Sequence, residues 1–167
     1  MKKHTLVIAF LLALVNMTSV QAQTSFEVPE NPVLKTKQDF IKFEPQIIQA
    51  AKWLEETDLD KEAEKRKKVS AFVVQYVSDC PSMNLVINEP LVKIYDKNSP
   101  LLSVFIANYA KNFIENKATA TKLTATKAGI LSMINVYSIG SSRAIGSINP
   151  RTIIAIASSS LSPRDMR

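Results

Sequence analysis

Apolar residues recur at helical intervals near the start of the chain. Within residues 38–56 they are separated mainly by three, four and seven positions, as on one face of an α-helix. These apolar positions are Phe40, Ile47, Ile48, Ala51 and Leu54. Pro45 interrupts the early part of this pattern, and a proline fits the first turn of a helix better than its interior because its missing N–H needs no partner there. We therefore predict a helix with Pro45, beside Glu44, in its first turn.

A second apolar stripe follows from Asp60. Its members are Ala63, Val69, Phe72, Val73, Tyr76 and Val77. Acidic residues crowd the start of this segment, where the positive end of a helix dipole favours them. Cys80 and Pro81 are expected to end the helix, because proline cannot continue it. The β-prone run 85–87 then allows an extended segment within residues 82–87, although six residues are weak evidence for a strand.

Two prolines mark further helix starts. Asn88 and Ser99 are capping residues one or two positions before Pro90 and Pro100, an arrangement common at helix N-termini. The helix after Pro100 has a wide apolar face that extends over about four turns. This face consists of Leu102, Phe105, Ile106, Tyr109, Phe113 and Ile114.

The last helix of the body is predicted over residues 119–137. Its apolar positions are Leu123, Ile130, Ile134 and Tyr137. Gly129 would let a neighbouring helix approach closely, because glycine has no Cβ. Five helices, one of them short, can bury such faces only against one another. We therefore predict an all-α fold, a small bundle or short stack of about five helices, with an irregular C-terminal tail.

The N-terminus has the pattern of a secretory signal peptide. Lys2 and Lys3 precede an uncharged apolar run over residues 6–15, and small residues lead up to Ala22. An apolar run of about ten residues is half the roughly 20 that span a bilayer. We expect cleavage after Ala22, which leaves a periplasmic or secreted mature chain without a transmembrane segment.

The C-terminal residues differ in composition from the helical domain, which we assign to residues 23–138. Residues 139–167 contain four arginines and no lysine, whereas the helical domain uses lysine for nearly all of its positive charge. No helical period continues there, and the run 152–157 is apolar and β-branched. Two hypotheses account for this atypical tail. It is a flexible or strand-like extension, or it is translated from a shifted reading frame, which would change the composition abruptly.

The formal net charge of +6 does not describe the helical domain. Much of it comes from the lysines before the apolar leader and the arginines of the tail, so we expect no clustered positive surface for nucleic acid. The only histidine is His4, which lies in the leader, and this excludes histidine-based catalysis and metal binding from the mature chain. No glycine-rich loop is present to bind a cofactor phosphate. We therefore predict no catalytic, cofactor or metal site.

Six residues remain as candidates for binding. Cys80 is the only cysteine, so a disulfide can form only between two chains, and an oxidising compartment would permit such a dimer. Trp53 is the only tryptophan, and its place beside the first apolar stripe suits core packing or the edge of a groove. The candidate lining of a groove or ligand site consists of Trp53, Phe105, Tyr109, Phe113 and Tyr137.

Four runs of sequence, residues 39–45, 50–57, 65–77 and 128–137, resemble small secreted helical proteins of unknown role from Bacteroidota. The resemblance covers about residues 1–138, is a pattern of helices and implies no site residues. This resemblance and the absence of catalytic groups lead us to expect a non-enzymatic module. Such a module would bind another protein or an envelope component in a groove between helices. One alternative is a carrier of a small apolar ligand inside the bundle, and another is a hydrolase that uses carboxylates.

Overall fold

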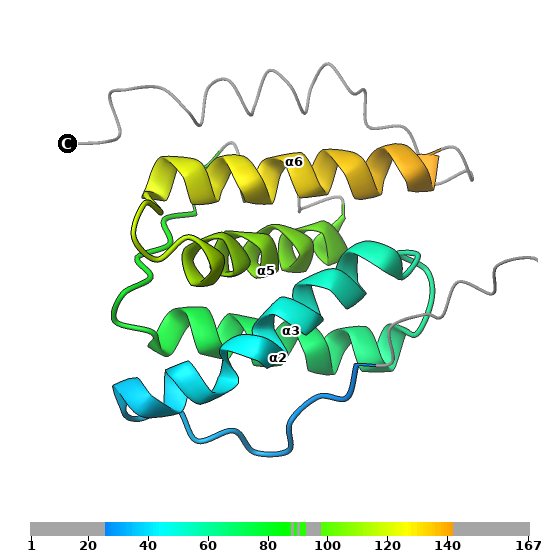
Figure 1. Cartoon of the computed structure of the whole chain (residues 1–167). Helices are drawn as coiled ribbons and strands as arrows, with labels where there is room; N and C mark the ends of the chain where they lie inside the picture. The colour runs from blue at the N-terminus through cyan, green and yellow to red at the C-terminus, as the bar shows by residue number, and fades with distance from the viewer. Residues whose placement is uncertain (1–25, 88, 90, 93–97, 142–167) are drawn as a thin grey trace, which may run out of the picture.

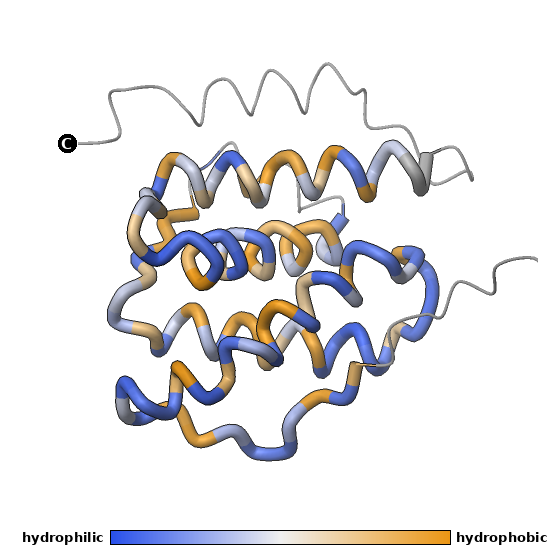
Figure 2. The backbone as a smooth tube through the Cα atoms, viewed as in Figure 1, coloured by the Kyte–Doolittle hydropathy of each residue, from blue (hydrophilic) through white to orange (hydrophobic). Residues whose placement is uncertain are grey.

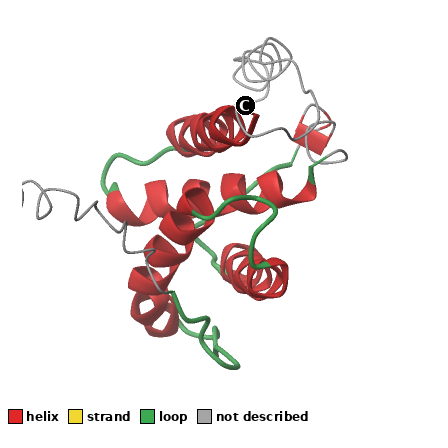
Figure 3. Cartoon of the chain, turned by 90° about the vertical axis from the view of Figure 1, so that its right-hand side faces the viewer, coloured by secondary structure: helices red, strands yellow, loops and turns green. Residues whose placement is uncertain are grey.

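The fold is all-α, as the periodicity predicts. The structure is a computed structural model and describes residues 26–87, 89, 91, 92 and 98–141. Over these residues it contains four helices and no strand: α2 (Lys37–Glu56), α3 (Ala63–Asp79), α5 (Ser99–Glu115) and α6 (Lys122–Ser141) (Figures 1 and 3). Of the predicted fifth helix, only Glu89, Leu91 and Val92 are described, and they have helical backbone.

Helix α5 lies at the centre of the bundle. It packs against α2, α3 and α6, and it separates α6 from α3, while α2 crosses the bundle obliquely (Figure 1). Its buried positions occupy most of its circumference, because it has neighbours on several sides. The α2 and α6 helices are also joined directly, since the Ser132 hydroxyl donates a hydrogen bond to the Glu55 carboxylate.

The start of α2 corrects the prediction for Pro45, which lies inside the helix and not in its first turn. Thr36 and Asp39 form a capping box that fixes the helix start well before the proline: the Asp39 amide donates to the Thr36 hydroxyl, and the Thr36 amide donates to the Asp39 carboxylate at 2.8 Å. The proline is tolerated because Pro45 is exposed, so water can bind the carbonyl of Ile41 that loses its helical partner.

Helix α3 begins later than predicted. Residues 58–61 form a turn in which the Lys61 amide donates to the Asp58 carbonyl, and Glu62 adopts the left-handed conformation with φ of 48°. Ala63 is therefore the first helical residue and is exposed, although the pattern placed it on the buried stripe. The other predicted stripe positions are buried, and the helix ends at Asp79 as expected.

Helix α6 also begins later than predicted, at Lys122. The Asn116 carbonyl accepts hydrogen bonds from the amides of Thr119 and Ala120, which makes a turn after α5. The Thr121 hydroxyl then accepts from the Thr124 amide and caps the new helix. Leu123 is consequently on the first turn and exposed, a correction to the predicted apolar face.

The other predicted positions of α6 agree with the structure in large part. Ile130 and Tyr137 are buried, and Ile134 packs against the core. Gly129 lies against α5, as its lack of a side chain suggested. Residues 83–87 form a loop and contain no strand. The predicted signal peptide lies outside the described residues, as does the predicted tail from residue 142 onward.

Candidate functional site

A groove opens beside α3 on the surface of the bundle. Its volume is about 260 Å³. Helix α3 contributes Val74, Val77 and Ser78, and α5 contributes Ile106. The opposite wall comes from the loop after α3 and consists of Met83, Asn84, Leu85 and Ile87. The groove therefore combines apolar side chains with a stretch of non-helical backbone, a combination that suits a peptide segment better than a pure hydrocarbon chain.

The surface around this groove is apolar and almost free of charge. The exposed fraction is 41% for Val74, 65% for Val86 and 40% for Ile87, so three large apolar residues are exposed beside the groove. We call the exposed residues of this surface the neutral face, which consists of Ala71, Val74, Ser78, Asn84, Val86 and Ile87. Clustered exposed apolar residues with few charges are typical of the centre of a protein–protein interface.

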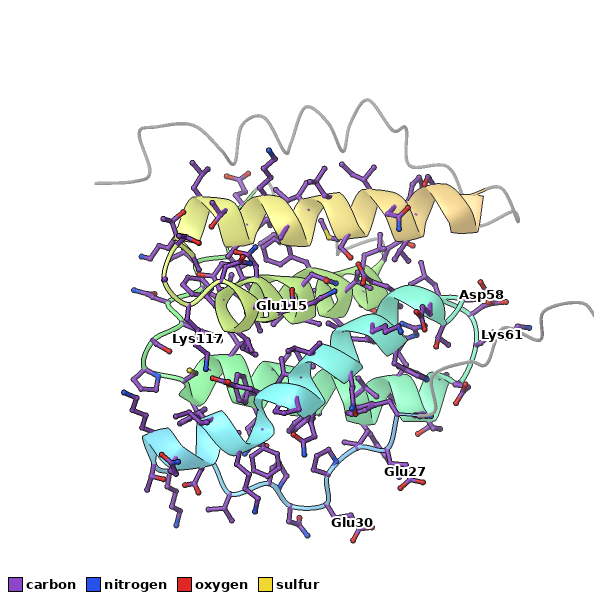
Figure 4. All side chains as sticks on the ribbon, in the orientation of Figure 1. Glu27, Glu30, Asp58, Lys61, Glu115 and Lys117 are labelled. Carbon is purple, nitrogen blue, oxygen red and sulfur yellow. The ribbon has the colours of Figure 1, made fainter. Side chains whose placement is uncertain are left out.

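Charge is concentrated in other parts of the chain. Between Val69 and Ile87 the only charged residue is Asp79, whereas residues 52–68 alternate acids and bases densely. Figure 2 shows the same change along α3, which is hydrophilic at its N-terminal end and more hydrophobic toward its C-terminal end. In Figure 4, Asp58 and Lys61 project from the α2–α3 corner. The neutral face is therefore distinct from the solvated corners of the bundle.

Tyr109 holds in place the loop of residues 83–87 that forms one wall of the groove. Its ring is buried in α5, and its hydroxyl donates a hydrogen bond of 3.2 Å to the carbonyl of Asn84. Burial raises the pKa of the Tyr109 phenol, because a phenolate would lose its hydration. Tyr76 makes an equivalent bond at another place, from its hydroxyl to the carbonyl of Phe40. Tyr109 thus supports the wall of the groove from inside the bundle.

The five aromatic residues predicted to line a site are parts of the packed interior. Trp53, Phe105, Tyr109 and Tyr137 are buried, and Phe113 is partly buried against the core. Along α5 the ring centroids of Phe105 and Tyr109 lie 6.3 Å apart, and those of Tyr109 and Phe113 lie 5.1 Å apart. The structure thus brings three of the five together, but the groove described above is lined by none of them.

Trp53 belongs to a buried cluster at the end of α2. The Lys65 ammonium lies 4.9 Å and the Arg66 guanidinium 5.4 Å from the centre of its ring. Arg66 is itself buried, and its Nη2 donates to the carbonyls of Thr57 and Asp58 at 2.7 and 2.9 Å. Burial lowers the pKa of Arg66, and the nearby carboxylates of Glu62, Asp58 and Asp60 oppose that shift. The cluster closes the α2–α3 corner and leaves no opening toward Trp53.

Cys80 is a buried thiol at the C-terminal end of α3. Its Sγ lies 3.2 Å from the Ser82 hydroxyl, and its amide donates to the Tyr76 carbonyl. The candidate disulfide between two chains would require this thiol to turn outward. The disulfide therefore stays a prediction, and it would need a rearrangement that exposes Cys80.

Among the described residues, no three histidine, cysteine, aspartate or glutamate side chains gather in a way that would hold a metal ion. None of the described helices combines the length and apolar content that a membrane crossing requires. No family model matches the chain, and no match is found among curated proteins or solved structures. The groove and the neutral face are therefore the features on which a function can be argued.

Proposed function

We propose that this protein is a non-enzymatic binding module that recognises a protein segment at the neutral face. The observation that carries the proposal is the coincidence of three exposed apolar side chains, Val74, Val86 and Ile87, with a groove in a region almost free of charge. Burial of exposed apolar surface is the main driving force of protein association. With the signal-peptide pattern, this supports a role in the periplasm or outside the cell.

The groove favours a protein partner over an apolar small molecule. A carrier needs an enclosed cavity that covers most of its ligand. The aromatic residues considered for such a cavity instead pack against core neighbours. The groove is open to solvent and borders non-helical backbone at residues 83–87, which can exchange main-chain hydrogen bonds with a peptide.

Site-specific photocrosslinking tests this proposal in the native host. A photoreactive phenylalanine analogue is introduced at position 86 on the neutral face and, as a matched control, at position 131. Leu131 is 55% exposed and lies on α6, on the other side of α5 from α3. We expect a discrete protein adduct from position 86 and none from position 131. Adducts of equal yield from both positions, or a lipid adduct from position 86, would contradict the proposal.

A further inference from the structure

The outer side of α6 lacks the charges that a helix at the edge of a bundle usually carries. Among the described helices α6 forms one outer layer, with α5 beneath it (Figure 1). Its exposed positions beyond residue 128 are Leu131, Asn135 and Ser138, which we call the outer face of α6. Leu131 is 55% exposed, and residues 128–141 contain no charged residue. A surface helix normally places charges opposite its buried side, so this pattern is typical of a helix covered on both sides.

The other described helices differ from α6 in this respect. Each has exposed charges, for example Lys52 on α2, Lys68 on α3 and Glu115 on α5. The uncharged stretch of α6 is therefore a property of this helix and not of the whole bundle surface.

The chain itself supplies a segment that suits the outer face of α6. It continues past Ser141, and its residues 152–163 are uncharged and begin with the apolar, β-branched run 152–157. The stretch between Ser141 and Thr152 reaches about 35 Å when extended, whereas Leu131 lies about 15 Å from Ser141 along the helix. The apolar run is therefore able to return along α6 as far as Leu131.

Covalent attachment favours this segment over a separate molecule. A short flexible tether gives the attached segment an effective concentration of about the millimolar range, above that of most free partners. Neither residues 128–141 nor residues 152–163 contain a charge, so their contact buries no unpaired charge. The contact also removes the run 152–157 from water, where such a sequence is prone to aggregate.

We propose that the outer face of α6 is the docking site of this chain's own C-terminal segment, with residues 152–157 packed on Leu131. The inference does not rest on the proposed function, because α5 separates α6 from α3 and the groove beside it. It makes the C-terminal residues part of the fold, which favours the hypothesis of an extension over that of a shifted reading frame.

Limited digestion of the full chain with trypsin tests the inference. Arg151 directly precedes the apolar run, so docking should slow cleavage after this residue. Leu131→Asp should speed the cleavage by about tenfold or more, because a carboxylate under the run raises the population of the undocked state. Val86→Asp introduces the same charge at a 65% exposed position in the loop after α3 and should leave the rate unchanged.

A change in the segment itself should have the same effect. Ile156→Asp should also speed cleavage after Arg151, and the double variant with Leu131→Asp should be no faster than the faster single variant, because both changes break one contact. The fluorescence of Trp53 should be unaltered in each variant, since the bundle remains folded.

Photocrosslinking from position 131 locates the contact directly. The photoreactive residue should join residues 152–163 of the same chain, whereas the one at position 86 should not. This internal product adds no mass, so position 131 remains a valid control for adducts with a partner. Equal cleavage after Arg151 in the wild-type chain and Leu131→Asp, additive effects in the double variant, or no internal crosslink from position 131 would overturn the inference.

Discussion

Gly129 of α6 lies directly against Phe105 of α5. A methyl group added to Gly129 would come within 2.6 Å of Phe105 Cδ2 and 2.7 Å of the Phe105 carbonyl oxygen. The Phe105 ring can rotate only into a packed core, and the Phe105 carbonyl is fixed in the helix. Moving either group would therefore cost free energy. The contact between α5 and α6, the most extensive between two helices of the described bundle, therefore depends on the absence of one side chain.

Gly129→Ala is expected to destabilise the fold. Alanine favours a helix over glycine by about 1 kcal/mol, but overpacking against the fixed Phe105 backbone costs about 1–3 kcal/mol. We predict a net loss of about 1 kcal/mol in the free energy of unfolding, measured by urea denaturation. Lys127→Ala, an exposed change in the same helix, serves as the control and should stay within about 0.5 kcal/mol. A stabilised Gly129→Ala variant would mean that α5 and α6 are less closely packed than described.

Arg66→Ala should weaken the α2–α3 corner. The change leaves the Thr57 carbonyl without the Arg66 donor and removes the guanidinium that lies over the Trp53 ring. We expect a loss of about 2–4 kcal/mol in stability. Trp53 is the only tryptophan, so its fluorescence should also become more accessible to acrylamide.

Lys68→Ala, at an exposed position on the same helix, is the control for Arg66→Ala and should change neither quantity. Unaltered Trp53 quenching in Arg66→Ala would show that the guanidinium does not close the corner.

Tyr109→Phe should loosen the groove loop without unfolding the bundle. It removes only the hydroxyl that binds the Asn84 carbonyl, a loss of about 1 kcal/mol. Hydrogen exchange of residues 83–87 should become faster. Tyr76→Phe is the matched control, because it removes an equivalent hydroxyl whose partner is the Phe40 carbonyl. Faster loop exchange in both variants would show that the effect is global and that Tyr109 does not position the loop.

Stability should decline in alkaline solution because of the same two tyrosines. Burial raises the pKa of both Tyr76 and Tyr109 above the ordinary value of 10.0. As the pH rises past 10, the unfolded chain loses these protons while the folded chain retains them, so ionisation favours unfolding. The wild-type chain should lose stability progressively as the pH rises above about 10, the ordinary tyrosine pKa, toward the raised pKa values of the folded chain. Tyr76→Phe should reduce that slope, and an unchanged slope in urea titrations at several pH values would argue against this cause.

The parts of the fold that the sequence predicted are those governed by local rules. The stripes around Val73 and Ile106 follow helical periodicity, and Pro100 marks the start of α5 because proline is preferred in a first turn. The helix boundaries were less accurate, since turns decide them. Pro45 was misplaced because a capping box at Thr36 starts α2 earlier, and the threonine and aspartate three positions apart carried that signal.

The candidate site was harder to predict than the fold. Large aromatic residues such as Trp53 and Tyr109 are obvious candidates for a binding site in a sequence. They also bury a large apolar area, and in this protein both pack in the core. The groove is formed by Val74, a loop and Ile106, which come together only after folding. A sequence signal for it did exist in the long charge-poor stretch between Val69 and Ile87.

The central position of α5 also bears on how the chain reaches its native state. Helices α2 and α3 are made first, but both bury apolar residues against α5, which follows later. A nascent chain that ends before Ser99 therefore lacks the surface that completes its interior. Such a chain should remain sensitive to proteases until α5 is available to pack against it.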